Sequence, residues 1–173
     1  MVPCVCLDLK DLNKAVKREH YRIPTAEDMA SRLSGKCVFS ILDEKDGFWQ
    51  IKVDDESSLL CTFNTPFGRY RFHRCPFGIC SALEILQKKN DQLFGDINGV
   101  EVFFDDLIIA AKDIADHDRI LEQVLQHARK NNVKFNINKF QFHVSEVNYV
   151  GNVVSAGGPK ARPRKSESNY RIP

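Results

Sequence analysis

The 173-residue sequence contains no apolar run that approaches the roughly 20 residues needed to cross a bilayer. It also lacks a signal peptide at its start, where a charged segment, an apolar run and small residues would follow one another. Both absences argue against a membrane or secreted protein. We expect a soluble, intracellular protein that makes no membrane contact.

A zinc-type cysteine pattern is also missing. The six cysteines include the close pairs Cys4 and Cys6 and Cys75 and Cys80, but these have no partner pairs and no nearby histidines. Four of the six lie in apolar or β-rich stretches, where cysteine behaves as a small hydrophobe. Reduced, structural thiols are therefore the expected state.

The sequence has little net charge, +2 from 25 basic and 23 acidic residues. With 43% hydrophobic residues the chain is large enough to bury a core, which argues for one folded domain. The charge is unevenly distributed, with basic residues in 10–22 and 160–171 and acidic residues in 101–118. Basic flanks around an acidic centre suit a polyanion that approaches bound cations. On charge alone, two solvated surfaces explain the pattern better.

Apolar periodicity and turn residues predict an α+β fold, with an antiparallel sheet and helices on one face. We expect helices over 26–34, 81–94 and 113–130. Strands are expected over 2–9, 36–43, 48–53, 59–65, 69–74, 99–104, 107–111, 139–142 and 147–155. From Gly157 onward, glycine, proline and charge predict disorder.

Asp105 and Asp106 separate two β-rich runs and are expected to form the two-residue loop of a hairpin. Such loops favour Asn-Gly or Asp-Gly, and two aspartates crowd charge that a cation would offset. Mg²⁺ prefers oxygen ligands, and Asp43, at the end of an apolar run, is a natural third carboxylate. Two such ions about 3.5–4 Å apart suit phosphoryl transfer. A solvated Asp-Asp turn explains the local pattern equally well, and for Asp43 alone a strand end without a role is the better explanation.

Several motifs in a fixed order resemble the reverse transcriptases of gypsy-type LTR retrotransposons. The likeness runs from about Val5 to Ser155 and is carried by residues 11–14, 39–43, 47–51, 62–68, 76–78 and 103–106. It implies an RNA-directed DNA polymerase, with a palm and partial fingers over 1–155, no thumb, and a disordered basic tail over 156–173. The chain is then expected to be a fragment of a Pol polyprotein, and by analogy cytoplasmic or nuclear.

The resemblance also implies a role for individual residues. Asp43, Asp105 and Asp106 would be the catalytic carboxylates that hold two Mg²⁺ ions, with Mn²⁺ as a substitute. The deoxynucleoside triphosphate would meet Phe48, which excludes a 2′-hydroxyl, together with Phe77, Gly78 and Gln87. The RNA or DNA primer–template would meet Lys14, Lys17, Arg18, Tyr149 and Gly151.

The sequence departs from the family pattern at several positions. Cys4 stands where arginine is usual, and the basic hairpin before it is missing, so cations that meet the triphosphate are lost. Phe103 replaces the usual tyrosine, Leu83 a proline and Asn152 a histidine. These departures keep two alternatives open, which are a catalytically inactive nucleic-acid-binding remnant and a relic without function.

Overall fold

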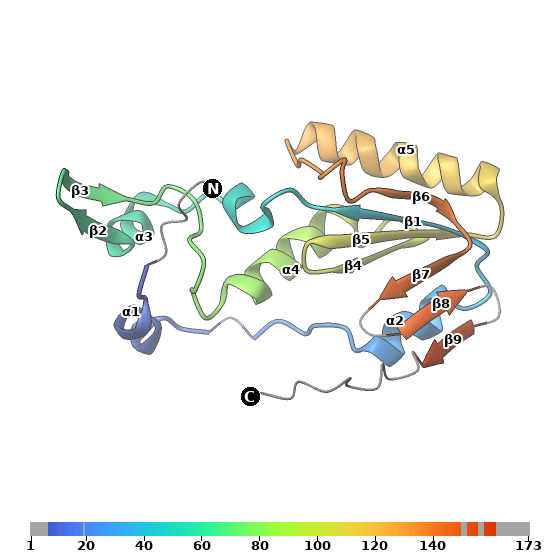
Figure 1. Cartoon of the computed structure of the whole chain (residues 1–173), viewed down its shortest axis with the longest axis horizontal. Coiled ribbons are helices and arrows are strands. Elements are labelled where there is room, and N and C mark those ends of the chain that lie inside the picture. Colours follow the sequence, from blue (N-terminus) through green and yellow to red (C-terminus); the bar gives the residue numbers. More distant parts are fainter. Residues whose placement is uncertain (1–6, 19, 150–151, 156–157, 162–173) are drawn as a thin grey trace, which may run out of the picture.

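The structure is a computed structural model that describes residues 7–18, 20–149, 152–155 and 158–161. At its centre is an antiparallel sheet of four strands in the order β4-β5-β1-β6 (Figure 1). Its strands are β1 (Val38–Asp43), β4 (Val100–Phe103), β5 (Asp106–Ala111) and β6 (Gln141–Val144). None of the helices formed by the described residues has the length and apolar character needed to cross a membrane.

Both faces of the sheet are covered. The two long helices, α4 (Ala82–Phe94) and α5 (Ile114–Lys130), pack on one face, where they bury Leu107 and Ile109 of β5. On the other face α2 (Ala26–Leu33) packs against Ile108. Burial from both sides explains why 107–111 is a continuous apolar run and not an alternating one. The expected α+β fold is confirmed, and α2 adds a layer opposite the long helices.

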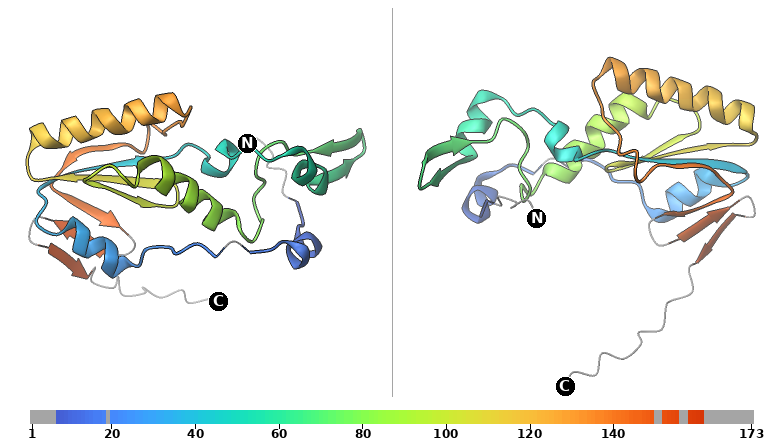
Figure 2. Two further views of the ribbon diagram at one scale, coloured as in Figure 1. Left: turned by 180° about the vertical axis from the view of Figure 1, so that it is seen from behind. Right: turned by 45° about the horizontal axis from the view of Figure 1, so that its top comes forward.

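The remaining elements lie at the two ends of this body (Figures 1 and 2). One end carries α1 (Lys10–Ala15), the 3₁₀ helix η1 (Gly47–Gln50), α3 (Asp55–Leu60) and the hairpin of β2 (Thr62–Thr65) and β3 (Gly68–Arg71). The other end carries a three-stranded sheet of β7 (Glu146–Tyr149), β8 (Asn152–Ser155) and β9 (Gly158–Ala161).

The helices expected over 26–34, 81–94 and 113–130 correspond to α2, α4 and α5. Thr25 caps α2 as its sequence predicts. The Thr25 hydroxyl accepts a hydrogen bond from the Asp28 amide at 3.1 Å, and the Asp28 carboxylate accepts one from the Thr25 amide. Local capping chemistry therefore places this helix where the apolar pattern begins.

Several expected elements were wrong. Residues 48–50 lie in η1 instead of a strand, because Asp46 adopts a left-handed conformation and its carbonyl accepts a hydrogen bond from the Trp49 amide, and residues 51–53 contribute only an isolated bridge from Lys52 to Arg74. Residues 59–60 end α3, whose N-cap is the carboxylate of Asp54. Residues 7–9 are not a strand, and residues 1–6 lie outside the described residues. Residues 158–161 form β9 instead of being disordered, and residues 162–173 are also outside the described residues.

Gly99 tests how tightly β4 is packed. It has a φ of 93°, and a Cβ there would lie 2.7 Å from Ile120 Cδ1 and 3.0 Å from the Ala110 carbonyl oxygen. We expect Gly99→Ala to destabilise the fold by about 2–4 kcal/mol, since left-handed strain and overpacking add. Gly35 also has a positive φ but open space around it, so Gly35→Ala is expected to cost only about 1 kcal/mol. Equal losses in urea unfolding would contradict the packing argument.

Candidate active site

Two of the three predicted aspartates are brought together by strand pairing. β1 and β5 run antiparallel, and Asp43 lies directly opposite Asp106 at the end of this ladder. Directly opposed residues have Cβ atoms about 4.5–5.5 Å apart, and like charges in such a pair repel. The pair is therefore unfavourable unless a cation lies nearby.

The hairpin turn differs by one residue from the expected one. Phe103 pairs with Asp106, so the loop residues are Phe104 and Asp105, and Asp106 belongs to the strand. Phe104 takes the left-handed conformation, with a φ of 55°. The Asp105 carbonyl accepts a hydrogen bond of 2.6 Å from the Glu44 amide, which ties the turn to the residue after Asp43.

A basic side chain, Lys139, contacts Asp43 and is influenced by the charges of Asp105 and Asp106. Its ammonium group donates a 2.7 Å hydrogen bond to Asp43 Oδ2. This bond and the charge of Asp43, followed by the charges of Asp105 and Asp106, raise the pKa of Lys139. Asp43 is thus already paired with a cation, and the charges of Asp105 and Asp106 act on the same ammonium group. Sequence reasoning missed Lys139, because it lies 96 residues from Asp43 and no local pattern links them.

The electrostatics of Asp106 fit a cation site. Burial, then the charges of Asp105 and Asp43, raise the pKa of Asp106 to about 6, while Lys139 opposes the shift. A divalent ion among these oxygens would remove the repulsion, and carboxylate oxygens are the donors that Mg²⁺ prefers. The residues present therefore fit the metal that the family resemblance implies.

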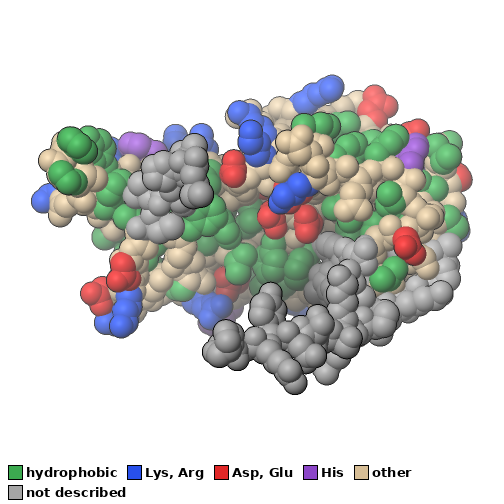
Figure 3. Space-filling model, viewed as in Figure 1, with side chains coloured by type: hydrophobic (Ala, Val, Ile, Leu, Met, Phe, Trp, Pro, Cys, Tyr) green, Lys and Arg blue, Asp and Glu red, His purple; other side chains and the backbone are tan. Residues whose placement is uncertain are grey.

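The aspartates open onto two hollows. Asp43, Asp105 and Lys139 line a pocket of about 350 Å³. Asp43 and Lys139 also line a second, more open hollow of about 470 Å³ together with Asp106. Figure 3 shows acidic side chains gathered near the middle of the visible face with a basic side chain beside them. A ligand in either hollow would contact Asp43.

Two predicted nucleotide contacts, Phe48 and Phe77, line the same pocket as Asp43 and Asp105. Their rings meet edge to face, with centroids 5.5 Å apart, and Phe77 remains 44% exposed. Gly78 follows at a φ of 96°, and its carbonyl accepts a hydrogen bond from the Asn13 side chain at 2.7 Å. Phe48 and Phe77 therefore form an aromatic wall beside the carboxylates.

Gln87 is not in this wall. Its side chain is fully buried, and its amide donates to the Val102 carbonyl and to Asp91 while its oxygen accepts from the Phe104 amide at 2.7 Å. Asn90 donates to the Phe104 carbonyl at 2.8 Å. These contacts assign Gln87 to holding the hairpin, in place of the nucleotide contact that was expected, because its polar atoms are directed at the backbone.

The residues predicted to meet the primer–template lie away from this pocket. Lys14 and Lys17 lie in and just after α1, and Lys14 is paired with Asp11 at 2.6 Å. Arg18 is paired with Glu84 of α4 at 2.8 Å. Tyr149 ends β7, where it pairs with Asn152, and Gly151 lies outside the described residues.

Glu44 is a further charged residue of the site that the sequence did not single out. It is only 1% exposed, and neither carboxylate oxygen has a hydrogen-bond partner among the described residues. Burial raises the pKa of Glu44 to about 7; the charge of Lys89 and the amide of Asn90 oppose the shift, and Asp105 adds to it. The sequence did offer one signal for Glu44, which is that a charged residue directly follows a buried strand.

Comparison with solved structures defines the class of fold. The foamy viral protease-reverse transcriptase dRH in complex with double-stranded DNA matches with a TM-score of 0.83 at 20% identity, over 91% of this chain and 28% of that one. The foamy viral protease-reverse transcriptase in complex with an RNA/DNA hybrid matches with a TM-score of 0.81 at 20% identity, over 90% and 21%. The chain therefore has the reverse transcriptase fold.

The family follows from the sequence. The model of the family described as reverse transcriptase (RNA-dependent DNA polymerase) matches residues 1–154, and this chain belongs to that family. It is 34% identical over 166 residues to "Uncharacterized protein K02A2.6" of Caenorhabditis elegans, covering 95% of this chain and 13% of that protein. It is 30% identical over 174 residues to the retrovirus-related Pol polyprotein from transposon 297 of Drosophila melanogaster, covering 98% and 16%.

A third relative is the enzymatic polyprotein of cauliflower mosaic virus (strain NY8153), which is 28% identical over 168 residues, covering 96% of this chain and 25% of that protein. The chain thus spans a quarter or less of the length of these three relatives. The resemblance to retrotransposon reverse transcriptases is confirmed.

Glu44 yields a prediction about stability and pH. The pKa of Glu44 is about 7 in the folded chain and near 4.5 in the unfolded chain. Between these pH values the carboxyl group is protonated in the folded chain and ionised in the unfolded chain, so wild-type stability falls as the pH rises. We expect Glu44→Gln, in EDTA, to be more stable than the wild type at pH 8 by up to about 3 kcal/mol, with a smaller difference at pH 5. Chemical denaturation at both pH values measures it. The exposed-site control Glu122→Gln should track the wild type, and parallel wild-type and Glu44→Gln curves would refute the buried-acid argument.

Proposed function

We propose that this chain is the fingers and palm part of an RNA-directed DNA polymerase that extends a primer on an RNA or DNA template. The observation that carries the proposal is the placement of Asp43, which lies opposite Asp106 in the β1–β5 ladder, shares a pocket with Asp105 and is paired with the ammonium group of Lys139. A two-metal centre needs carboxylates from neighbouring strands, and β1, β5 and the turn before β5 supply three. Membership in the reverse transcriptase family and the matching fold support the same activity.

The three aspartates would hold two Mg²⁺ ions, which Mn²⁺ can replace, because the donor set consists of carboxylate oxygens alone. When bound, the ions neutralise the triphosphate and favour the deprotonated primer hydroxyl. Lys139 offsets part of the charge of Asp43 through its 2.7 Å hydrogen bond. Gln87 and Asn90 keep the backbone of Phe104, and hence Asp105, in place.

The incoming deoxynucleoside triphosphate would lie in the pocket that Phe48 and Phe77 share with Asp43 and Asp105. The ring of Phe48 would pack beneath the sugar and exclude a 2′-hydroxyl. Gly78 would let the backbone approach the nucleotide, since its φ of 96° suits glycine.

Nucleic acid would pass between the sheet body and the end that carries α1 and the β2–β3 hairpin. The two foamy viral structures named above hold double-stranded DNA and an RNA/DNA hybrid. The four-stranded sheet with α4 and α5 would be the palm, and α1, α3 and the β2–β3 hairpin the fingers. Lys14, Lys17 and Arg18 would lie toward the template, and Tyr149 and Gly151 toward the primer end.

Primer extension on poly(rA)·oligo(dT) with dTTP and Mg²⁺ tests the activity. We expect incorporation by the wild type and a loss of about 100-fold or more in Asp105→Asn, because one metal-facing charge is removed while the shape is kept. Asp116→Asn removes a carboxylate on α5 and should match the wild type. Equal incorporation by the wild type and Asp105→Asn would end the catalytic claim, and salt-dependent duplex binding without incorporation would favour an inactive binding remnant.

Phe48→Val tests the sugar contact. Shortening the ring should leave room for a 2′-hydroxyl, so the preference for dTTP over UTP in the same assay should fall by about 10-fold or more. Phe67→Val is the matched control, since Phe67 is 89% exposed at the tip of the β2–β3 hairpin. A preference that stays at the wild-type value in Phe48→Val would remove Phe48 from the nucleotide site.

A further inference from the structure

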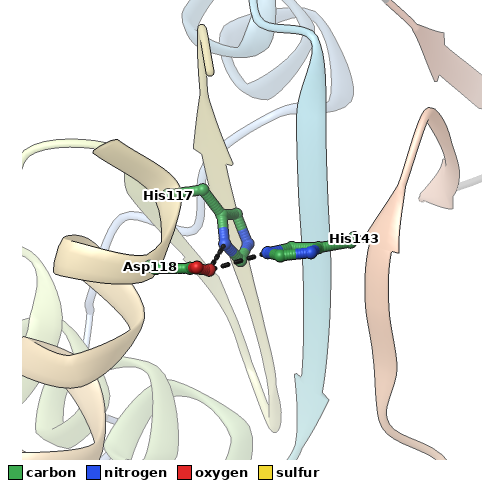
Figure 4. A group of neighbouring side chains, drawn as sticks. All are labelled: His117, Asp118 and His143. Atoms are coloured by element: carbon green, nitrogen blue, oxygen red, sulfur yellow. Dashed lines mark hydrogen bonds and ion pairs between the residues drawn. The ribbon is translucent and has the colours of Figure 1, made fainter. Parts of the chain in front are cut away.

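Two imidazoles and a carboxylate gather where α5 begins and β6 runs past it (Figure 4). One oxygen of Asp118 lies 3.2 Å from His117 Nδ1 and 2.7 Å from His143 Nε2. One ligand atom from each residue can be chosen so that all three lie within 4.8 Å of one another. This group is separate from the aspartates of the polymerase site. The His143 amide donates a hydrogen bond to Ser40, and Ser40 lies three residues, or about 10 Å, along β1 from Asp43.

His117 is the most deeply buried member of this group. Its side chain is completely buried, yet Nε2 has no hydrogen-bond partner among the described residues. In Figure 4 the nitrogen-bearing edge of its ring faces Asp118 and His143. An unpartnered buried nitrogen is unfavourable, and a metal ion bound at Nε2 would give this nitrogen a strong ligand bond.

The backbone and the neighbouring rings hold His143 toward His117. His143 has a φ of 49°, which non-glycine residues rarely adopt, and the pairing of β1 with β6 shifts register beside it. Its amide donates to Ser40 Oγ at 3.2 Å, and Phe142 stacks on its ring with centroids 3.8 Å apart. The rings of His117 and His143 stand edge to face, 4.7 Å apart. The kink in β6 therefore turns a ligand-bearing ring toward α5.

We propose that His117, Asp118 and His143 bind one divalent transition-metal ion of the Zn²⁺ type, which joins α5 to the edge strand β6. Two nitrogens and one carboxylate oxygen suit Zn²⁺, whereas Mg²⁺ prefers oxygen donors. A tetrahedral zinc site needs ligand atoms about 3.3 Å apart. One ligand atom of each residue already lies within 4.8 Å of the other two, and the 2.7 Å between Asp118 Oδ1 and His143 Nε2 requires only a small widening. The Asp118 side chain is 52% exposed, which leaves water access for a fourth ligand.

The ion would act structurally. β6 is the edge strand of the sheet and pairs with β1 through an irregular ladder, so its attachment is weaker than that of β5. A metal bond from β6 to α5 would fasten this edge at the point where the ladder is interrupted. It would also limit the movement of β7, which follows β6 directly and contributes Val147 to the core.

Zinc titration of the full chain tests this site, after chelator treatment and with Mg²⁺ in excess to occupy the carboxylates of the other site. Calorimetry should show one Zn²⁺ per chain, and the melting temperature should rise by about 5–10 °C at 100 times the dissociation constant. Affinity should fall at least 10-fold in His143→Gln and in Asp118→Asn. The exposed Asp118 makes its variant the safer one for folding, and circular dichroism without metal checks both.

His127→Gln is the matched control, because His127 is an exposed histidine on the same helix, and it should bind Zn²⁺ as the wild type does. Asp105→Asn should also keep the site, which separates this proposal from the polymerase activity. Co²⁺ should give the visible bands of a tetrahedral nitrogen and oxygen site without a thiolate charge-transfer band. No Zn²⁺ binding by the wild type, unchanged binding in His143→Gln, or a thiolate band from a cysteine would each overturn the proposal.

Discussion

The candidate active site depends on the register between β1 and β5. Five of the six residues from Asp106 to Ala111 are buried, and β1 is buried almost throughout. A slip of one residue would turn these apolar side chains to the wrong faces, so the two-sided core permits one pairing. That pairing places Asp43 opposite Asp106, although the two charges repel. The core thus imposes a concentration of negative charge, and the protein offsets part of it with Lys139.

A second layer of polar contacts keeps the third carboxylate in place. Gln87 and Asn90 reach from α4 to the amide and the carbonyl of Phe104, so the left-handed turn residue is held from both sides. Glu44, buried beside the turn without a hydrogen-bond partner among the described residues, works against this order when it is ionised. The residues around the turn therefore hold Asp105 in place through Gln87 and Asn90 and lower the stability of the fold through Glu44.

Sequence patterns predicted the parts that depend on local rules. Apolar periodicity identified α2, α4, α5 and the strands around the aspartates, because their buried faces are encoded locally, and side-chain caps add a start signal for α2 and α5. The pattern failed at 48–53 and 59–60, where strand-like side chains lie in η1 and α3. It placed the hairpin turn one residue too late, since pairing with Asp43 extends β5 to Asp106. Lys139 and the hairpin role of Gln87 arise only from tertiary contact, which a linear sequence does not display.

The segment from Lys139 to His143 links the two proposed cation-binding regions of the sheet. Lys139 meets Asp43 at one end, and His143 meets Asp118 and Ser40 at the other. Carboxylate oxygens at the first region and imidazole nitrogens at the second select different ions, so the two would not compete. Because only three residues separate Lys139 from His143, fastening His143 to α5 would restrict how far Lys139 can withdraw when Mg²⁺ enters.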